Sequence, residues 1–258
     1  MAYPKITVNT GLALEILASD TILIPSPDLT TITGTSTGVT SGTANSNVQD
    51  ELVDTTTNFL LATAPLPVVV GDRVISIVSG AATAALATIT GTTIPLGADI
   101  FPNGNETYAI VKVNHLTVSG ETFITKGVSV GDVVYNTTAK TVTTVTAVNS
   151  ETDLTLATGL FDGSATFNDD YKIFLAGSPL GQRVINSSEG CLLYVGSNAA
   201  VGTLDIDTAY VNIKVKTTAG NDVVFSRFPV GEYLPIQVLQ LYVTGSDASA
   251  ISNCIAIW

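Results

Sequence analysis

Polar and apolar positions alternate over short stretches of this 258-residue chain, and turn-forming residues separate the stretches. The pattern is clearest over 116–174, where runs rich in Val and Thr are interrupted by Gly, Asn and Asp. Alternation with a period of two places successive side chains on opposite faces and predicts half-buried β-strands. Val142, Val145 and Val148 are three apart, a helical spacing, but the β-branched residues around them favour a strand. The sequence therefore predicts an all-β protein.

An internal repeat accompanies this pattern, because residues 53–111 carry the same landmarks in the same order as 116–174. The Val-Gly-Asp at 70–72 corresponds to that at 130–132, an offset of 60 (131 − 71). Phe59 and Phe123 match at an offset of 64 (123 − 59), as a small loop insertion would produce. An internal period of this kind predicts a tandem array of small β domains.

The N-terminal part is less regular. Lys5–Val8 and Thr21–Ile24 are predicted strands, while Gly11–Ala18 fits either a strand or one or two turns of helix. Residues 28–50 are rich in Thr, Ser and Gly, which favours a linker or flexible arm, with an edge strand around Leu29–Ile32 as the alternative. We expect residues 1–50 to form an arm that reaches a neighbouring subunit.

The predicted organisation has four parts: the N-terminal strands and arm (1–50), a first β repeat (51–115), a second β repeat (116–178) and a C-terminal β domain (179–258), sandwich-like or barrel-like. The strands expected after the arm are 73–78, 84–89, 93–96 and 108–113, then 133–135, 141–148, 153–157 and 171–175, and finally 191–195, 211–217, 222–228, 236–243 and 254–258.

The Gly-Asp pair follows a Val-rich run in both repeats. Gly71 and Gly131 suit a positive φ angle, and Asp72 and Asp132 suit a hydrogen bond to the backbone two residues on, so each pair predicts a tight turn. A calcium contact is disfavoured because such sites need several spaced oxygen ligands.

Composition narrows the functional classes. Only 12% of residues are charged, and the net charge is −12. Nucleic-acid binding is excluded because it needs clustered Lys and Arg, whereas ten basic residues are scattered through the chain. The N-terminus lacks a basic region followed by an apolar run, so we expect no targeting segment, no membrane span and synthesis in the cytoplasm. A neutral, Thr-rich surface is typical of a protein packed against neighbours.

Catalytic motifs are absent. His115 is the only histidine, and it lies where the two repeats join, so we interpret it as a linker or surface residue. Carboxylates that lie close in sequence, which a glycosidase mechanism would require, are interpreted as solvated turn or edge residues: Asp205 and Asp207, Asp169 and Asp170, and Asp162. We predict that the chain is not an enzyme, with no catalytic, cofactor-binding or metal-binding residues and no cofactor.

The two cysteines, Cys191 and Cys254, are 63 residues apart (254 − 191). That spacing fits neither a metal site nor a disulfide framework, so two buried thiols are expected. A disulfide would require the first and last strands of the C-terminal region to be neighbours.

Several stretches resemble repeated β modules of virion structural proteins from tailed bacteriophages of marine bacteria and cyanobacteria. These are LVDTTTNF (52–59), VGDRV (70–74), GVSVGDVVYNTT (127–138) and TVTAV (144–148), while FPVGEYLPIQVLQLYVTGS (228–246) and the ending IAIW (255–258) resemble the C-terminal module of such proteins. The resemblance covers most of residues 50–258. It implies a role in particle architecture and brings no catalytic residue with it.

The function expected from these observations is a capsid decoration or cement protein. Such a protein would bind the major capsid protein, or other virion proteins, and would form a dimer or trimer by analogy with symmetric cement proteins. Its expected location is the virion. The alternatives are a tail, baseplate or receptor-binding component and, from another class, a carbohydrate-binding module. The last is weakened because aromatic residues make up only 7% of the chain and the sole Trp is Trp258.

Overall fold

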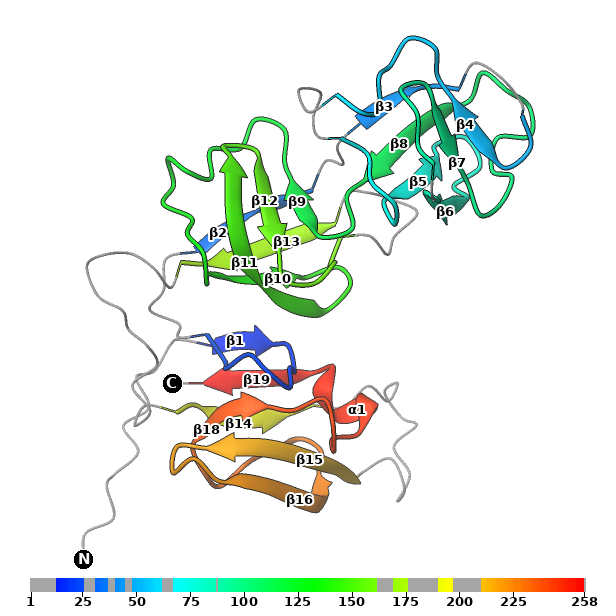
Figure 1. Cartoon of the computed structure of the whole chain (residues 1–258). Coiled ribbons are helices and arrows are strands. Elements are labelled where there is room, and N and C mark those ends of the chain that lie inside the picture. The colour runs from blue at the N-terminus through cyan, green and yellow to red at the C-terminus, as the bar shows by residue number, and fades with distance from the viewer. Residues whose placement is uncertain are drawn as a thin grey trace, which may run out of the picture. The chain divides into compact units, whose positions relative to one another are not determined.

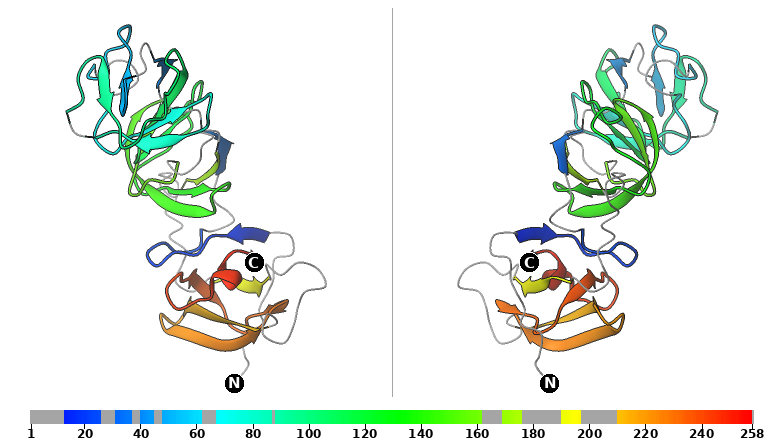
Figure 2. Two further views of the ribbon diagram at one scale, coloured as in Figure 1. Left: turned by 90° about the vertical axis from the view of Figure 1, so that its right-hand side faces the viewer. Right: turned by 90° about the vertical axis from the view of Figure 1, so that its left-hand side faces the viewer.

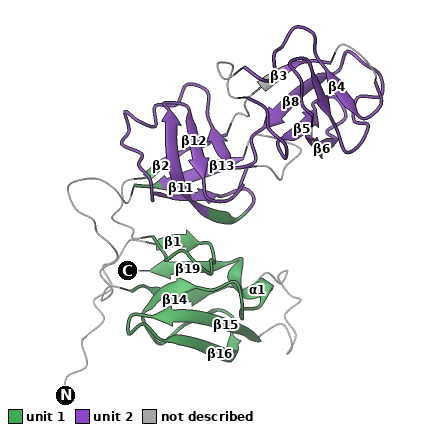
Figure 3. Ribbon diagram, viewed as in Figure 1, with its two compact units in different colours: residues 1–31, 140–142, 174–258 green, residues 32–139, 143–173 purple. Residues whose placement is uncertain are grey.

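The structure is a computed structural model, and it describes residues 13–25, 31–36, 40–44, 48–61, 67–86, 88–161, 169–175, 190–196 and 210–257. Within these residues the chain is nearly all-β, with several antiparallel sheets and one short helix, as predicted (Figure 1). It divides into two compact units, which are described separately (Figure 3). Unit 1 contains 1–31, 140–142 and 174–258, and unit 2 contains 32–139 and 143–173.

Unit 1 has a four-stranded sheet in the order β1-β19-β14-β17 and a three-stranded sheet in the order β16-β15-β18. Figure 2 shows the C-terminal strands of this unit from two sides. The elements are β1 (Ala13–Ile16), β14 (Leu192–Val195), β15 (Tyr210–Thr217), β16 (Asp222–Pro229), β17 (Glu232–Tyr233), β18 (Val238–Leu241), α1 (Ala248–Ile251) and β19 (Cys254–Ile257). Alternate residues of both sheets meet in one apolar cluster, which includes Leu193, Ile213 and Ala256.

Unit 2 has a six-stranded sheet in the order β2-β13-β10-β11-β12-β9, a four-stranded sheet in the order β3-β8-β5-β6 and the pair β4-β7. The strands are β2 (Thr31–Thr35), β3 (Thr40–Thr43), β4 (Glu51–Val53), β5 (Arg73–Ser76), β6 (Ala82–Ala84), β7 (Thr93–Pro95), β8 (Thr107–Val111), β9 (His115–Thr117), β10 (Val133–Asn136), β11 (Thr141–Ser150), β12 (Asp153–Leu156) and β13 (Asp170–Phe174). We call residues 48–113 the upstream segment and residues 114–175 the downstream segment.

The described part of 1–50 contributes three strands to sheets, where we predicted an arm with an edge strand around Leu29–Ile32 as the alternative. β1 pairs with β19, β2 lies beside β13, and β3 pairs with β8. The N-terminal residues thus supply one strand to each of three sheets that are otherwise built from later residues. Apolar burial favours this, because Ile16 and Ile32 are each buried beneath their sheets.

Most predicted strands are present with shifted ends, and three differences stand out. Gly11–Ala18 resolves into strand β1, whereas Thr21–Ile24 is not a strand. The strand expected over 84–89 lies at Ala82–Ala84 instead. The helix α1 was not predicted. The predicted strand Lys5–Val8 lies outside the described residues.

The two Gly-Asp turns have the predicted backbone conformation. Gly71 and Gly131 have φ angles of +96° and +97°. The side-chain bonds differ from the prediction, because Asp72 accepts from the N–H of Val69 at 2.8 Å and Asp132 from that of Ser129 at 2.9 Å, three residues upstream. Each Asp side chain therefore stabilises its own turn by accepting the backbone N–H at the start of that turn.

Corresponding backbone hydrogen bonds occur in the upstream and downstream segments. They lie 64 residues apart before the loop that follows Phe59 or Phe123, and 60 apart after it. The pairs are Asp54 N to Thr92 O with Val118 N to Thr152 O, Phe59 N to Gly91 O with Phe123 N to Glu151 O, Val68 N to Phe59 O with Val128 N to Phe123 O, Gly71 N to Ala85 O with Gly131 N to Val145 O, and Leu96 N to Asp50 O with Leu156 N to Asn114 O, all at 2.7–2.9 Å.

Candidate functional site

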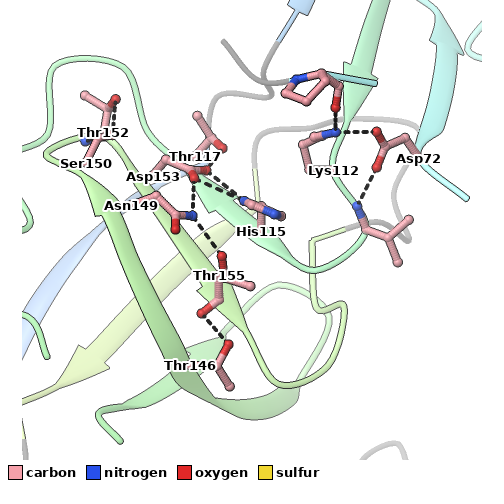
Figure 4. Close-up of polar contacts among 12 residues, drawn as sticks. Asp72, Lys112, His115, Thr117, Thr146, Asn149, Ser150, Thr152, Asp153 and Thr155 are labelled. Atoms are coloured by element: carbon pink, nitrogen blue, oxygen red, sulfur yellow. Dashed lines mark hydrogen bonds and ion pairs between the residues drawn. The ribbon is translucent and has the colours of Figure 1, made fainter. Parts of the chain in front are cut away.

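A polar cluster lies around Asp153 in the downstream segment (Figure 4). Antiparallel pairing places Asp153 opposite Thr117 and Thr155 opposite His115 on strands β12 and β9. Both carboxylate oxygens lie 3.1 Å from His115 Nδ1, while Thr117 Oγ1 donates at 2.8 Å and Asn149 Nδ2 at 2.6 Å. We call these four residues the Asp153 cluster.

Burial and hydrogen bonding act in opposite directions on the Asp153 carboxyl. Burial disfavours its charged form and raises its pKa, but hydrogen bonds from His115, Asn149 and Thr117 outweigh that effect, so its pKa lies below the usual value. The cluster is thus organised around an ionised carboxylate. Within the described residues, the hydrogen bonds of the His115 side chain are all made by Nδ1 to Asp153, so they fix the orientation of the ring.

A buried ion pair lies in the upstream segment. Lys112 Nζ is 2.6 Å from Asp72 Oδ2, and the two side chains are 5% and 2% exposed. Lys112 also donates to the carbonyl oxygen of Pro67. A buried pair is tolerated when its remaining donors and acceptors are also bonded, and here the bonds join the Gly71-Asp72 turn to the end of β8. We therefore interpret the pair as structural, because the charge of each side chain is balanced by the other.

Two buried tyrosines occupy corresponding places in the two segments. Tyr108 OH donates to Asp54 Oδ2 at 2.7 Å, and Tyr171 OH donates to Glu121 Oε2 at 2.9 Å. Burial, with the acceptor carboxylate second, raises the pKa of both phenols. Each ring also packs edge-on against a Phe, at 6.2 Å and 61° for Phe59 and at 6.2 Å and 62° for Phe123.

The remaining sequence candidates are dispersed. His115 is partly buried and bonded to Asp153 rather than being a surface or linker residue. Asp169 is buried and Asp170 exposed, so they do not share a site. Asp162, Asp205 and Asp207 lie outside the described residues. No group of three or more His, Cys, Asp or Glu side chains that could hold a metal ion occurs in the described part of the chain.

Both cysteines are free and buried. Strands β14 and β19 are neighbours, but the register places Cys254 opposite Val195, while Cys191 bridges to Val238. Burial raises the pKa of each thiol to about 12. They are therefore core residues without thiolate character.

Exposed apolar side chains recur at corresponding turns. Val70 and Val130, which precede the two turn glycines, are 62% and 66% exposed. Leu60 and Ile124, which follow the two packed Phe residues, are 52% and 54% exposed. We call these four residues the duplicated apolar positions.

The sequence pattern singles out His115 but not its partner Asp153, and it gives no sign of the bond between Tyr171 and Glu121. Asp153 was considered only as the first residue of a strand, and the bond between Lys112 and Asp72 spans 40 positions (112 − 72) without a local motif. No protein-family model, no curated protein and no solved structure matches the chain. Among the described residues, no helix is long and apolar enough to cross a membrane.

Proposed function

We propose that this chain is a structural protein of a phage virion, most simply a capsid decoration protein, built around two copies of one β module. In this interpretation residues 40–113 form one copy, and 31–36 with 114–175 form the other. Support comes from the corresponding backbone bonds of the two segments and from their matched Tyr–Phe contacts. The resemblance of 52–59, 127–138 and 228–246 to phage virion modules points the same way.

The observation that carries the proposal is the exposure of the duplicated apolar positions. A single exposed Val or Leu is ordinary on a protein surface. Exposure at the same two places in both segments, at Leu60 and Val70 and again at Ile124 and Val130, is expected of side chains that contact a partner. Two equivalent contact sets on one chain suit a partner that presents one surface repeatedly, as a shell of identical subunits does.

The test is the copy number of the chain in purified virions, measured by quantitative mass spectrometry against the major capsid protein. A ratio near parity, or a simple fraction such as one-third, is expected for a decoration protein arrayed over the shell. A ratio of a few per cent would assign it to the tail, baseplate or vertices. Absence from the particle would overturn the structural proposal.

A second candidate function, carbohydrate binding in a receptor-binding component, is favoured by one observation. Tyr194 and Tyr233 lie opposite each other on β14 and β17, with ring centroids 5.3 Å apart, and Tyr233 is exposed. Aromatic faces of this kind bind apolar faces of ligands. Binding of the purified chain to a glycan array, lost in Tyr233→Ala, would support this function, and an array with no bound glycan would remove it.

A further inference from the structure

Asp169 is a buried carboxylate with an unusual hydrogen-bonding deficit. It is 2% exposed and precedes β13. Its Oδ2 accepts from Asn136 Nδ2 at 2.8 Å, but among the described residues its Oδ1 has no hydrogen-bond partner. A buried oxygen of this kind costs free energy unless something bonds to it, so an orphan carboxylate oxygen in a native fold requires an explanation.

The corresponding carboxylate in the upstream segment has no such deficit. Glu106 accepts from Ser76 Oγ at Oε2, at 2.9 Å, and from the N–H and side-chain amide of Asn103 at Oε1, at 3.3 and 3.0 Å. The backbone places the two acids alike, because the carbonyls of Glu106 and Asp169 accept from Ala44 N and Ser36 N, both at 2.9 Å. Within the part of the chain that the structure describes, both carboxylate oxygens are therefore bonded at this position in the upstream segment, whereas one of them is not in the downstream segment.

One further oxygen atom, the backbone carbonyl oxygen of Leu160, lies beside the Asp169 carboxylate. The carbonyl oxygen of Leu160 accepts from the same Asn136 Nδ2 at 2.7 Å, so the carbonyl and the carboxylate lie around one amide nitrogen. No Lys, Arg or His among the described residues forms an ion pair with Asp169. Carboxylate and carbonyl oxygens are the donor types that hard divalent cations prefer.

We propose that Asp169, with the carbonyl oxygen of Leu160, forms part of a calcium-binding site in the downstream segment. Calcium takes six to eight oxygen ligands, many of them carbonyls and waters, so one carboxylate does not complete the shell by itself. The cation bonds to Oδ1 and takes the place of the positively charged partner that Asp169 lacks among the described residues. The inference is independent of the virion proposal, because it rests only on contacts within unit 2.

The experiment measures thermal unfolding of the full-length chain after treatment with EDTA, with and without Ca²⁺, alongside Mg²⁺ at equal concentration. Saturating Ca²⁺ is expected to raise the Tm of the transition that includes the downstream segment by at least about 4 °C, and Mg²⁺ by less. In Asp169→Asn the response to Ca²⁺ is expected to vanish. Glu106→Gln, the matched change in the upstream segment, is expected to retain it.

Native mass spectrometry of the wild-type chain gives a second result that does not depend on any variant folding. One bound Ca²⁺ per chain is expected after EDTA removal and titration back. Absence of specific Ca²⁺ binding, or an equal Ca²⁺ response in wild type and folded Asp169→Asn, would overturn the proposal and leave a buried water as the partner of Oδ1.

Discussion

At the scale of single residues, two glycines lie so close to the buried tyrosine rings that there is no space for a side chain at either position. A Cβ built on Gly34 would lie 2.6 Å from Tyr171 Oη, and one on Gly42 would lie 2.6 Å from Tyr108 Oη. Both glycines belong to N-terminal strands, and both tyrosines belong to strands more than 60 residues later. The absence of a side chain therefore lets two distant strands pair closely over a bulky ring.

We predict that Gly34→Ala and Gly42→Ala each destabilise unit 2 by about 1–3 kcal/mol, because the methyl group forces the buried ring to move. Urea unfolding measures the loss. Gly91→Ala is the control, since its Cβ would meet only Asn58 Oδ1, at 3.2 Å, which is an exposed side chain that can shift. Equal losses in all three variants would contradict the ring contact as the cause.

The lowered pKa of Asp153 predicts that this carboxyl contributes to the loss of folding stability in acid. The pKa of Asp153 is lowered in the folded chain, so the unfolded state binds more protons as pH falls. The stability that this group contributes is fully present above its unfolded pKa, near 3.8, and is lost as pH falls through the lower folded value. Acidification thus removes stabilisation from the downstream segment.

Asp153→Asn should therefore lose less free energy of unfolding between pH 7 and pH 3 than the wild-type chain does, although it starts less stable. The remaining acid sensitivity belongs to other carboxyls whose pKa values are lowered, Asp54 and Glu121 among them. Denaturant unfolding at the two pH values provides the measurement. Glu232→Gln, a change at an exposed carboxylate, should leave the loss unchanged. A loss in Asp153→Asn as large as in wild type would refute the linkage.

At the scale of elements, the sequence predicted strands best where alternation and a turn coincide. The hairpins β11–β12 and β15–β16 each join two alternating or β-branched runs through a turn, and their predicted and observed ends agree within two residues. Strands β2 and β3 are difficult to recognise from the sequence, because stretches rich in Thr, Ser and Gly occur in linkers as well as in strands. Their role depends on tertiary contacts with the distant β13 and β8, which local periodicity does not encode.

The first described strand is an element whose removal should matter. β1 completes a sheet beside β19, and the residues after it bond to the region of β18, with Ser19 N donating to Leu241 O and Ile24 N to Leu239 O, both at 2.9 Å. Ile16 and Ile24 are buried in the core of unit 1. Burial of each such side chain contributes about 1.5–3 kcal/mol, a large share of a domain's stability.

Deletion of residues 1–25 should accordingly leave unit 1 unfolded or insoluble, because it removes both side chains and exposes the edge of β19. Deletion of 1–12 is the control, since it removes no described strand. Solubility and thermal unfolding of the two truncated chains provide the comparison. A folded chain lacking 1–25, with the Tm of the full-length protein, would contradict the role assigned to β1.

At the scale of the whole molecule, the sequence predicted the class of the fold better than the candidate sites. Alternation and β-branched composition are distributed over the chain, so an all-β protein followed directly. The Asp153 cluster joins His115 to residues 34–38 positions away (149 − 115 and 153 − 115), and the Asp169 deficit depends on which donors reach one oxygen. Contacts of this kind follow from strand register, which the sequence alone does not determine.

Only 12% of the residues are charged, which makes the exposed apolar side chains the features most suited to binding. Val70→Thr and Val130→Thr conserve side-chain shape and leave the core intact, because both residues are in exposed turns. On the proposed function, each change should weaken rebinding of the purified chain to particles that lack it. The double variant should lose more than either single variant, since two equivalent contacts on one chain reinforce each other.

Val78→Thr is the matched control for that prediction. Val78 is 67% exposed and lies in a turn, as Val70 and Val130 do, but the downstream segment has Thr138 at the corresponding position, so its exposure is not duplicated. If exposure alone determined binding, Val78→Thr would weaken rebinding as much as Val70→Thr. If duplication marks the contact surface, Val78→Thr rebinds like the wild-type chain. Rebinding at the wild-type level by the Val70→Thr, Val130→Thr double variant would remove these turns from the interface, whatever the copy number in the virion.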